Sequence, residues 1–583
     1  MTRNAKVREM KKRILILMAL IGLFFLVLFA QIMRLQALAQ KSGSGTVSRV
    51  AGARGRGPAG SGTGQRGTIV DSNGYLVVAD DPQWVLSATP INIRPKDTEE
   101  IAGKLSQITG IPEEKIAERI DKARKQGARY VELSDTPLPW DVGMKVLKVF
   151  PPREYRNIVT VTLRPKRVYG QGDLFGGITG FYGWNQSGRH CGIYGVEGFY
   201  DAFLTRGGFV PEADLSEAQA LPEKYAGRYL PSVVGHDLIL TVDRNIQYIV
   251  EDELKKAVER YKGEKGIAVV MDPYTGDILA MAAYPPLKPT DPHPAISQPF
   301  EPGSVFKVVT AAAALDSGTV TMNQVFTDTG KIEIGGKYIQ NAEKKAYGRV
   351  TIREVMYYSL NVEAAKMALD MGPDTFYNYL HRFGVGEKTE IDMTPESDGF
   401  VRWPVGKRWS EYDLAANSFG QGLSATVLQM VTAVAAIANG GNLVRPHVVK
   451  ALVVDGKYIP YGVSIKRRQI IKKDTARKVT ELMTIAARIG RKDLIPGYSV
   501  AGKTGTAQVP TEHGYDPYKV NTSFVGFVPA KNPRFVCMVT IMKPKWGGWA
   551  TVVAAPTFKA IAERILYYMK VPPDNPRNLN GTG

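Results

Sequence analysis

The chain is organised around Phe300-Glu301-Pro302-Gly303-Ser304-Val305-Phe306-Lys307. Pro302 and Gly303 favour a turn, and the apolar, Ala-rich run that follows predicts a helix stopping at Gly318. Ser304 is then expected at the helix N-terminus, where free backbone N–H groups favour negative charge. Lys307 lies one turn later on the same face. A serine nucleophile needs a neighbouring base, and a lysine can be that base if burial or another cation lowers its pKa.

Two later motifs strengthen this prediction: Ser359-Leu360-Asn361 and Lys503-Thr504-Gly505-Thr506. Each motif alone has an ordinary structural explanation. Ser-x-x-Lys arises by chance in long sequences, Ser359 and Asn361 could cap a helix, and Lys503 could be a surface strand lysine. In this order and at these separations, however, they match the Ser-x-x-Lys, Ser-x-Asn, Lys-Thr-Gly set of penicillin-interacting serine enzymes. We therefore predict a serine-based catalytic site.

Composition limits the alternatives. The 583 residues suggest several domains, and 44% hydrophobic with 22% charged residues is typical of globular protein. Cys191 and Cys537 are too few for a disulfide framework, and we expect both to be buried, although one bridge between them stays open. The six histidines show no metal-ligand spacing, so no metal or other cofactor is expected. No platform of interleaved basic and aromatic residues suggests nucleic-acid binding.

The net charge of +19 is concentrated around one apolar segment. Residues 1–13 carry +5 and residues 34–67 carry +6, and they flank an uncharged run that reaches about 20 residues at 14–33. The dense basic cluster before this run predicts a cytoplasmic N-terminus and a single membrane-spanning helix. A cleaved signal peptide is the alternative, because Ala37-Leu38-Ala39 resembles a cleavage site. Either way, the rest of the chain is expected outside the cytoplasm.

The region before the catalytic motifs predicts an irregular α+β module. Asn73-Gly74 indicates a hairpin, 98–127 a helical pair, 155–168 a strand and 170–198 a loop. From residue 236 the pattern becomes regular. We expect helices at 244–261, 425–439 with Ser424 as N-cap, and 557–570, and a largely helical stretch at 349–371. Strands are expected at 266–271, 277–284, 498–509, 521–528 and 534–542, which gives one sheet flanked by helices.

With these motifs, the chain resembles the class B penicillin-binding proteins, peptidoglycan D,D-transpeptidases of the FtsI / penicillin-binding protein 2 type. The resemblance also includes Arg66-Gly67, Gly195-x-Glu197, Glu301-Pro302-Gly303-Ser304 and Ser418-Phe419-Gly420-Gln421-Gly422. It implies an α+β fold with a pedestal (dimerisation-type) domain and a penicilloyl-serine transferase domain around a five-stranded antiparallel sheet. One departure is Glu390, where relatives often have glycine.

The predicted organisation has six segments. They are a cytoplasmic basic tail at 1–13, a transmembrane helix at 14–33, a flexible Gly/Ser/Arg linker at 34–65, a pedestal domain at 66–232, a transpeptidase domain at 233–572 and a C-terminal tail at 573–583.

The resemblance implies a role for each motif residue. Ser304 would attack the penultimate D-Ala carbonyl of a stem peptide ending in D-Ala-D-Ala, with Lys307 as base and Ser359 as proton relay. Lys503 would help to keep Lys307 neutral, and Asn361 would hold the substrate amide. Thr504, Gly505 and Thr506 would bind the substrate, the two hydroxyls holding its terminal carboxylate. The expected partners are an acceptor amine from a neighbouring stem, β-lactams, the membrane, a polytopic membrane glycosyltransferase, and division or elongation proteins.

Three other functions remain open on the sequence. A class A β-lactamase would carry Glu-x-x-x-Asn between the second and third motifs, and the sequence has none there. A D,D-carboxypeptidase would pass the acyl group to water and would not need the large N-terminal module. A scaffold would use that module to recruit partners, with enzyme activity secondary. Phe-Glu-Pro-Gly before Ser304, Lys-Thr-Gly and the chain length favour a division-type enzyme over an elongation-type one.

Overall fold

The computed structural model describes residues 66–155, 158–205, 219–225, 236–405, 409–461, 468–488, 492–511 and 514–575. The predicted tail, transmembrane helix and linker (1–65) lie outside the described residues, as do 576–583 of the predicted C-terminal tail. Within the described ranges, none of the helices has the length and apolar character needed to cross a bilayer.

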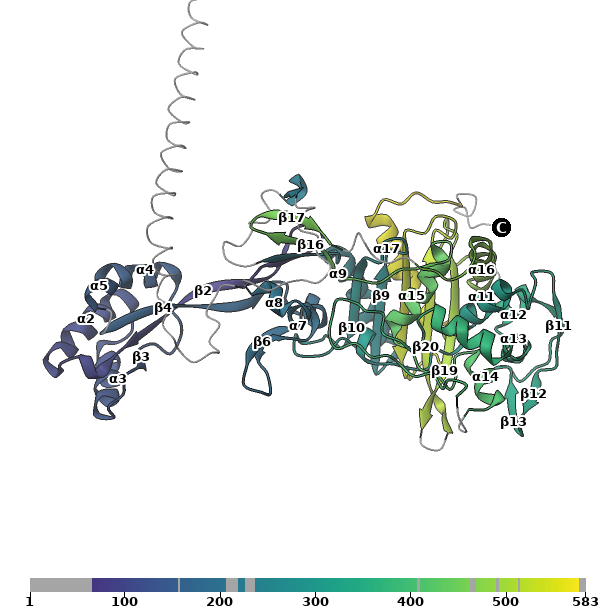
Figure 1. Ribbon diagram of the computed structural model, residues 1–583, viewed down its shortest axis with the longest axis horizontal. Coiled ribbons are helices and arrows are strands. Elements are labelled where there is room, and N and C mark those ends of the chain that lie inside the picture. Colours follow the sequence, from purple (N-terminus) through teal and green to yellow (C-terminus); the bar gives the residue numbers. More distant parts are fainter. Residues whose placement is uncertain are drawn as a thin grey trace, which may run out of the picture. The chain divides into compact units, whose positions relative to one another are not determined.

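Five antiparallel strands form a central sheet, as predicted. Their order in the sheet is β10-β9-β21-β20-β19. The strands span Lys265–Met271 (β9), Ile278–Tyr284 (β10), Ala501–Thr511 (β19), Gly514–Val528 (β20) and Phe535–Met542 (β21). Strands from early and late in the chain therefore lie side by side (Figure 1). β9 and β10 are joined at Gly276, whose φ of +83° is one that glycine adopts without strain.

Strands β9, β10, β20 and β21 send side chains into two hydrophobic cores, one on each face of the sheet. Ala268 and Val270 of β9 pack with α9 (Arg244–Tyr261) and α17 (Ala554–Tyr568). Ile267 and Val269 belong to a second core, which includes α11 (Lys307–Ser317) and α15 (Val427–Ala438). The sheet is thus buried on both faces, as a strand pattern of nearly continuous apolar residues requires.

The helical region on the second face also contains four short strands. Its further elements are α10 (Pro294–Ser297), α12 (Ile352–Tyr358), α13 (Asn361–Arg382), α14 (Glu411–Asn417), α16 (Lys473–Ala486), and the paired strands β11 (Val325–Asp328) with β14 (Gly348–Thr351) and β12 (Lys331–Ile334) with β13 (Lys337–Gln340). The expectation of helix from residue 349 is wrong for β14, whose pairing with β11 overrides the local preference.

The predicted N-cap at Ser424 is also wrong. α15 begins after Thr426, whose side chain accepts from the Gln429 N–H while the Gln429 side chain accepts from the Thr426 N–H. This reciprocal capping box satisfies two backbone donors at once, so it defines the helix start better than a single serine.

A second, eight-stranded sheet combines strands from the first part of the described chain with two later strands. Its order is β3-β2-β1-β8-β16-β17-β7, with β4 paired to β2. The strands are β1 (Ile69–Val70), β2 (Leu76–Ala88), β3 (Val131–Glu132), β4 (Val159–Tyr169), β7 (Gln219–Ala220), β8 (Asp237–Leu240), β16 (Val449–Val454) and β17 (Lys457–Pro460). Strands from both sides of residue 233 therefore share one hydrogen-bonded sheet. A separate two-stranded pair joins β15 (Asn442–Leu443) and β18 (Arg468–Gln469).

The helical pair predicted for 98–127 is confirmed as α2 (Thr98–Thr109) and α3 (Glu113–Lys125), which pack with α4 (Trp140–Val149) against β2; α5 is Pro152–Tyr155. The loop expected at 170–198 is wrong in part. It contains α6 (Gly176–Thr179), the hairpin of β5 (Phe181–Trp184) and β6 (His190–Ile193), and α7 (Gly195–Phe199), followed by α8 (Asp201–Leu204). The many glycines of this stretch indicated a loop, so its short helices and strands were not predicted.

A buried ion cluster joins the two motifs of this region that the resemblance included. The fully buried Glu197 carboxylate accepts from Arg66 Nε at 2.6 Å and from Arg167 Nε at 2.7 Å. Arg167 Nη1 also contacts Asp80 at 3.0 Å. Buried charges are stable only when paired, so these residues hold the start of β1, β2, β4 and α7 together.

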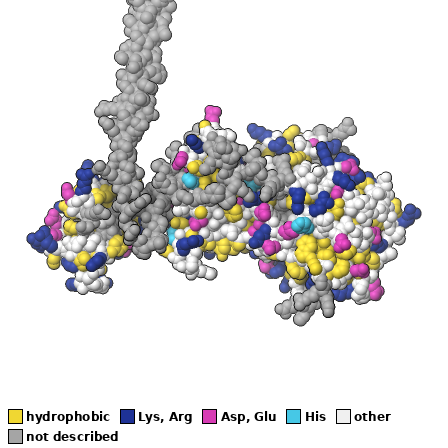
Figure 2. Space-filling view, viewed as in Figure 1, with side chains coloured by type: hydrophobic (Ala, Val, Ile, Leu, Met, Phe, Trp, Pro, Cys, Tyr) yellow, Lys and Arg dark blue, Asp and Glu magenta, His cyan; other side chains and the backbone are white. Residues whose placement is uncertain are grey.

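The state of the two cysteines, the backbone at Glu390 and the surface charge complete the description of the fold. Cys191 and Cys537 are both buried free thiols, so no bridge joins them. Glu390, the departure noted at a glycine position, has φ of +60°, a conformation in which glycine is the least strained residue. Figure 2 shows Lys and Arg side chains interspersed with Asp and Glu on the described face of the molecule.

Candidate active site

Ser304 lies on a single 3₁₀ turn, Gly303–Phe306, which leads directly into α11. The helix ends at Gly318, as predicted, in a left-handed conformation. Gly303 has φ of +59°, and its N–H donates to Gly420 O at 3.0 Å. A Cβ on Gly420 would lie only 2.3 Å from Gly303 O. The Ser-Phe-Gly-Gln-Gly segment therefore packs against the nucleophile turn so closely that only glycine fits at position 420.

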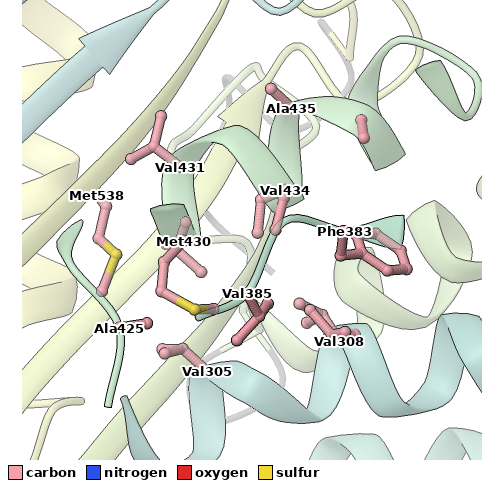
Figure 3. Close-up of a cluster of buried hydrophobic side chains, with 14 of the residues drawn as sticks. Val305, Val308, Phe383, Val385, Ala425, Met430, Val431, Val434, Ala435 and Met538 are labelled. Carbon is pink, nitrogen blue, oxygen red and sulfur yellow. The ribbon is translucent and has the colours of Figure 1, made fainter. Parts of the chain in front are cut away.

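A hydrophobic core fixes the base of this turn. Val305 and Val308 are fully buried and lie opposite Val385 and Met430 (Figure 3). Met538 of β21 closes the same cluster from the sheet. Close packing on this scale leaves little room for the turn to shift, so the position of Ser304 is set by side chains that take no part in chemistry.

The side-chain nitrogen of Lys307 is surrounded by oxygen atoms in the interior. Lys307 is 1% exposed, and its Nζ lies 3.1 Å from Ser304 Oγ and 3.1 Å from Ser359 Oγ. It also donates to Ser359 O at 2.5 Å and to Asn361 Oδ1 at 2.7 Å. Burial, followed by the charge of Lys503, lowers the pKa of Lys307 well below its ordinary value. The neutral amine that a general base requires is thereby favoured.

Ser359 connects the two lysines. It lies between α12 and α13 with φ of +57°, which is unusual for a residue other than glycine. Lys503 Nζ donates to Ser359 Oγ at 2.9 Å and to Thr504 O at 2.9 Å. Burial lowers the pKa of Lys503 to about 7. Hydrogen bonds thus run without interruption from Ser304 through Lys307 and Ser359 to Lys503.

Asn361 opens α13, and protein groups satisfy both ends of its amide. Its Oδ1 accepts from Lys307, while its Nδ2 donates to Gln340 O of β13 at 2.9 Å. The residue after Gln340 extends this support, because Asn341 Oδ1 accepts from the Val362 N–H and Asn341 Nδ2 donates to Asp328. Gln340 and Asn341 were not singled out in the sequence, since nothing local connects them to the Ser-x-Asn motif.

The third motif lies on β19, at the edge of the sheet. Packing requires glycine at two positions of this strand. A Cβ on Gly505 would lie 2.8 Å from Val305 Cγ1, and one on Gly502 would lie 2.5 Å from the Phe524 ring. Thr506 Oγ1 accepts from the Ala550 N–H at 3.2 Å, which ties β19 to the loop after β21. The strand therefore packs directly on the nucleophile turn.

Glu301, two residues before the nucleophile turn, connects that turn to its surroundings. Its Oε1 accepts from the Gly422 N–H at 3.1 Å and from Tyr515 OH at 3.1 Å. Its buried Oε2 has no hydrogen-bond partner among the described residues. Burial raises the pKa of Glu301. This carboxylate links the nucleophile turn to two neighbouring segments of the site.

The arrangement can carry out acyl transfer. A hydroxyl nucleophile, an adjacent base with a lowered pKa and a second polar relay lie within hydrogen-bond reach, which is the general pattern of nucleophilic catalysis. The structure brings Ser304, Lys307, Ser359, Asn361 and Lys503 together, with Thr504, Gly505 and Thr506 on the adjoining strand. In the described residues no cluster of histidine, cysteine and carboxylate side chains could hold a metal ion.

Comparison with known proteins gives the same reading of both regions. Residues 266–563 match the penicillin-binding protein transpeptidase domain, and residues 61–207 match the penicillin-binding protein dimerisation domain. The chain is 30% identical to stage V sporulation protein D of Bacillus subtilis over 513 residues, 84% of this chain and 76% of that protein. It is 29% identical to the peptidoglycan D,D-transpeptidase FtsI of Escherichia coli over 528 residues, 87% of this chain and 84% of that protein.

Solved structures agree. The fold resembles a peptidoglycan synthetase from Bifidobacterium adolescentis with a TM-score of 0.71, 23% identity and coverage of 88% of this chain and 97% of that one. Penicillin-binding protein 3 of Mycobacterium tuberculosis in complex with aztreonam gives a TM-score of 0.64 at 25% identity, covering 88% and 98%. Taken with the Ser304–Lys307–Ser359–Lys503 hydrogen bonds, these matches show that the chain belongs to the class B penicillin-binding proteins, the peptidoglycan D,D-transpeptidases of the FtsI / penicillin-binding protein 2 type.

Proposed function

We propose that this protein cross-links peptidoglycan stem peptides through an acyl-enzyme formed on Ser304. The observation that carries the proposal is the 3.1 Å contact between Lys307 Nζ and Ser304 Oγ, in a site that lowers the pKa of Lys307. A lysine held neutral beside a serine hydroxyl can take its proton as the oxygen attacks a carbonyl. The activity named for the FtsI relative supports the same reaction.

In the proposed acylation, Ser304 Oγ attacks the penultimate D-Ala carbonyl and its proton passes to Lys307. The C–N bond to the terminal D-Ala then breaks, and a proton reaches the departing amine through Ser359. Lys503 holds Ser359 in place and adds a positive charge that disfavours protonation of Lys307. Asn361 orients Lys307 and binds the substrate amide.

Substrate binding is assigned to the edge strand. The backbone N–H groups of Ser304 and Thr506 would stabilise the oxyanion, each worth roughly 3 kcal/mol in the transition state. The hydroxyls of Thr504 and Thr506 would bind the terminal carboxylate, with Gly505 keeping the strand against the nucleophile turn. An amine from a neighbouring stem then attacks the ester carbonyl, a new C–N bond forms and the C–O bond to Ser304 breaks. The proton lost by the attacking amine passes to Ser304 Oγ and restores the hydroxyl.

The proposed location follows from the sequence outside the described residues. Residues 14–33 would anchor the protein in the bacterial cell membrane by a single pass, with the N-terminus in the cytoplasm and the catalytic domain outside. A polytopic membrane glycosyltransferase would supply new glycan, and division proteins are favoured as partners over elongation proteins. A tagged copy found along side walls without a septal signal would contradict the division assignment.

The test is labelling by a fluorescent penicillin, with gain and loss of label followed on the wild type, Ser304→Ala and the control Ser317→Ala. Ser317 is exposed at the other end of α11, so its substitution leaves the site intact. Stable label on the wild type and control, absent from Ser304→Ala, is the expected result. Rapid loss of label with hydrolysed drug would favour a β-lactamase-like hydrolase or D,D-carboxypeptidase, and no label on any of them would favour the scaffold.

A further inference from the structure

A groove of about 760 Å³ lies at one end of the five-stranded sheet. Pairing of Tyr284 with Gly266 and of Met542 with Lys265 brings the ends of β10 and β21 next to the start of β9. The C-terminal end of α9 and the start of β20 complete the groove. None of the predicted catalytic residues lines it, so it is separate from the site described above.

The groove carries a positive charge. Four lysines line it, against two glutamates: Lys262, Lys519, Lys543 and Lys545, and Glu259 and Glu264. Both acids already have partners, because Glu264 pairs with Lys543 at 2.9 Å and Glu259 accepts from Tyr284 OH at 2.7 Å. Lys519 pairs with Asp516, which does not line the groove, at 3.7 Å, and across the described ranges Lys262 and Lys545 form no ion pair.

The backbone around the groove is held in place before any ligand arrives. The N–H groups of Lys545 and Trp546 donate to Tyr261 O, the last carbonyl of α9, at 3.0 and 3.2 Å. The Lys543 N–H donates to Val520 O of β20 at 3.0 Å. A ligand binding between these segments would therefore find the backbone that carries the lysines already in place, which lowers the entropy cost of binding.

One loop runs from this groove to the catalytic strand. It starts at Lys543 and reaches Ala550, whose N–H donates to Thr506 Oγ1 on β19. Between these two points lie Trp546, 66% exposed, and Trp549, 56% exposed. Lysines in the groove are thus followed by two exposed aromatic rings and then by the strand that carries Lys503 and Thr506.

We propose that the groove binds the carboxylate-bearing peptidoglycan strand whose stem peptide reacts at Ser304. Every uncross-linked stem ends in a carboxylate, so a strand presents repeated negative charges that the lysines attract. Sugar and aliphatic faces of the same strand pack on the exposed tryptophans. This inference rests on the proposed function and adds a second binding region, whose lining includes none of the predicted catalytic residues.

The experiment compares retention of the full-length, detergent-solubilised protein on purified peptidoglycan sacculi. The variant is Lys519→Glu with Lys545→Glu, and the matched control is Lys122→Glu with Lys125→Glu on the exposed face of α3, which makes the same charge change elsewhere. We expect the groove variant to bind sacculi about tenfold more weakly, with a reduced dependence on salt. The ratio of strand cross-linking to penicillin acylation should fall by a similar factor.

The outcomes separate the inference from the function on which it rests. Retention equal to that of the control would overturn the inference, even if penicillin still labels Ser304. Loss of binding to phosphatidylglycerol vesicles in the groove variant, with unchanged retention on sacculi, would also overturn it and assign the groove to lipid. Failure of the wild type to take up penicillin would instead refute the proposed function, since retention on sacculi does not need Ser304.

Discussion

Replacing Lys503 by methionine should move the pH dependence of acylation. Lys307 Nζ lies 3.1 Å and Lys503 Nζ lies 2.9 Å from Ser359 Oγ, so the two nitrogens are no more than about 6 Å apart. At that distance and an effective dielectric constant of about 20, two unit charges repel by about 3 kcal/mol, or about 2 pKa units. Because Lys503 has a pKa of about 7, it is only partly charged near neutrality.

The sign follows from the charge that is removed. A positive neighbour disfavours protonation, so Lys503→Met raises the pKa of Lys307 and fewer molecules hold it neutral at low pH. The acid limb of penicillin acylation should shift upward by about 1 to 2 pH units, with a larger rate loss at pH 6 than at pH 9. Stopped-flow acylation at several pH values measures both the limb and the plateau.

Lys503→Arg is the matched control, because arginine keeps its charge throughout this range. Its acid limb should stay at or below that of the wild type, even if the altered donor geometry lowers the plateau. An unchanged acid limb in Lys503→Met, with only the plateau lowered, would refute the reasoning. Burial alone, the larger cause of the lowered pKa, would then account for the neutral state of Lys307.

Three further changes have expected outcomes. Asn361→Ala removes the acceptor 2.7 Å from Lys307 Nζ and should slow penicillin acylation by about 100-fold with little change in melting temperature, whereas an unchanged rate would exclude an orienting role. Gly505→Ala places a Cβ 2.8 Å from Val305 of the nucleophile turn and should slow penicillin acylation by about tenfold or more. Gly548→Ala is the control, because no atom lies within 4 Å of its new Cβ. Equal acylation rates in the two variants would show that β19 shifts without cost. Glu197→Gln removes the negative charge that Arg66 and Arg167 share, and it should lower the free energy of unfolding in urea titrations by about 3–5 kcal/mol. The same change at Glu132, whose ion pair is exposed, should cost less than about 1 kcal/mol. Similar losses in the two variants would contradict the importance of burial.

Several elements could be predicted because local signals decide them. The helix at 244–261 has an aspartate N-cap and one apolar face, and its bounds match the prediction. The five strands of the central sheet were found from apolar runs bounded by turn residues. The three motifs identified the chemistry because acyl transfer by serine needs a base beside the nucleophile, and Ser-x-x-Lys places a lysine one helical turn from the serine.

Other features could not be predicted, because they depend on contacts between segments that are far apart in the sequence. β14 was expected to be helical, and only pairing with β11 makes it a strand. Gly335-Gly336 marks the hairpin of β12 and β13, but no local signal connects Gln340 of β13 to Asn361. Glu301 contacts Tyr515 more than two hundred residues later. The contact between Gly505 and Val305 also joins two distant parts of the chain, so the packing reason for this glycine could not be derived from the sequence.

The sequence by itself determined the type of chemistry, the central sheet and the position of the nucleophile at a helix start, since these follow from residue types and periodicity along the chain. Only the tertiary structure decided that Lys307 and Lys503 meet at Ser359 and are buried there. A pKa depends on the dielectric and the charges around a group, and residues nearly two hundred positions apart supply both. Folding therefore lowers the pKa of Lys307 far enough for this lysine to act as a general base.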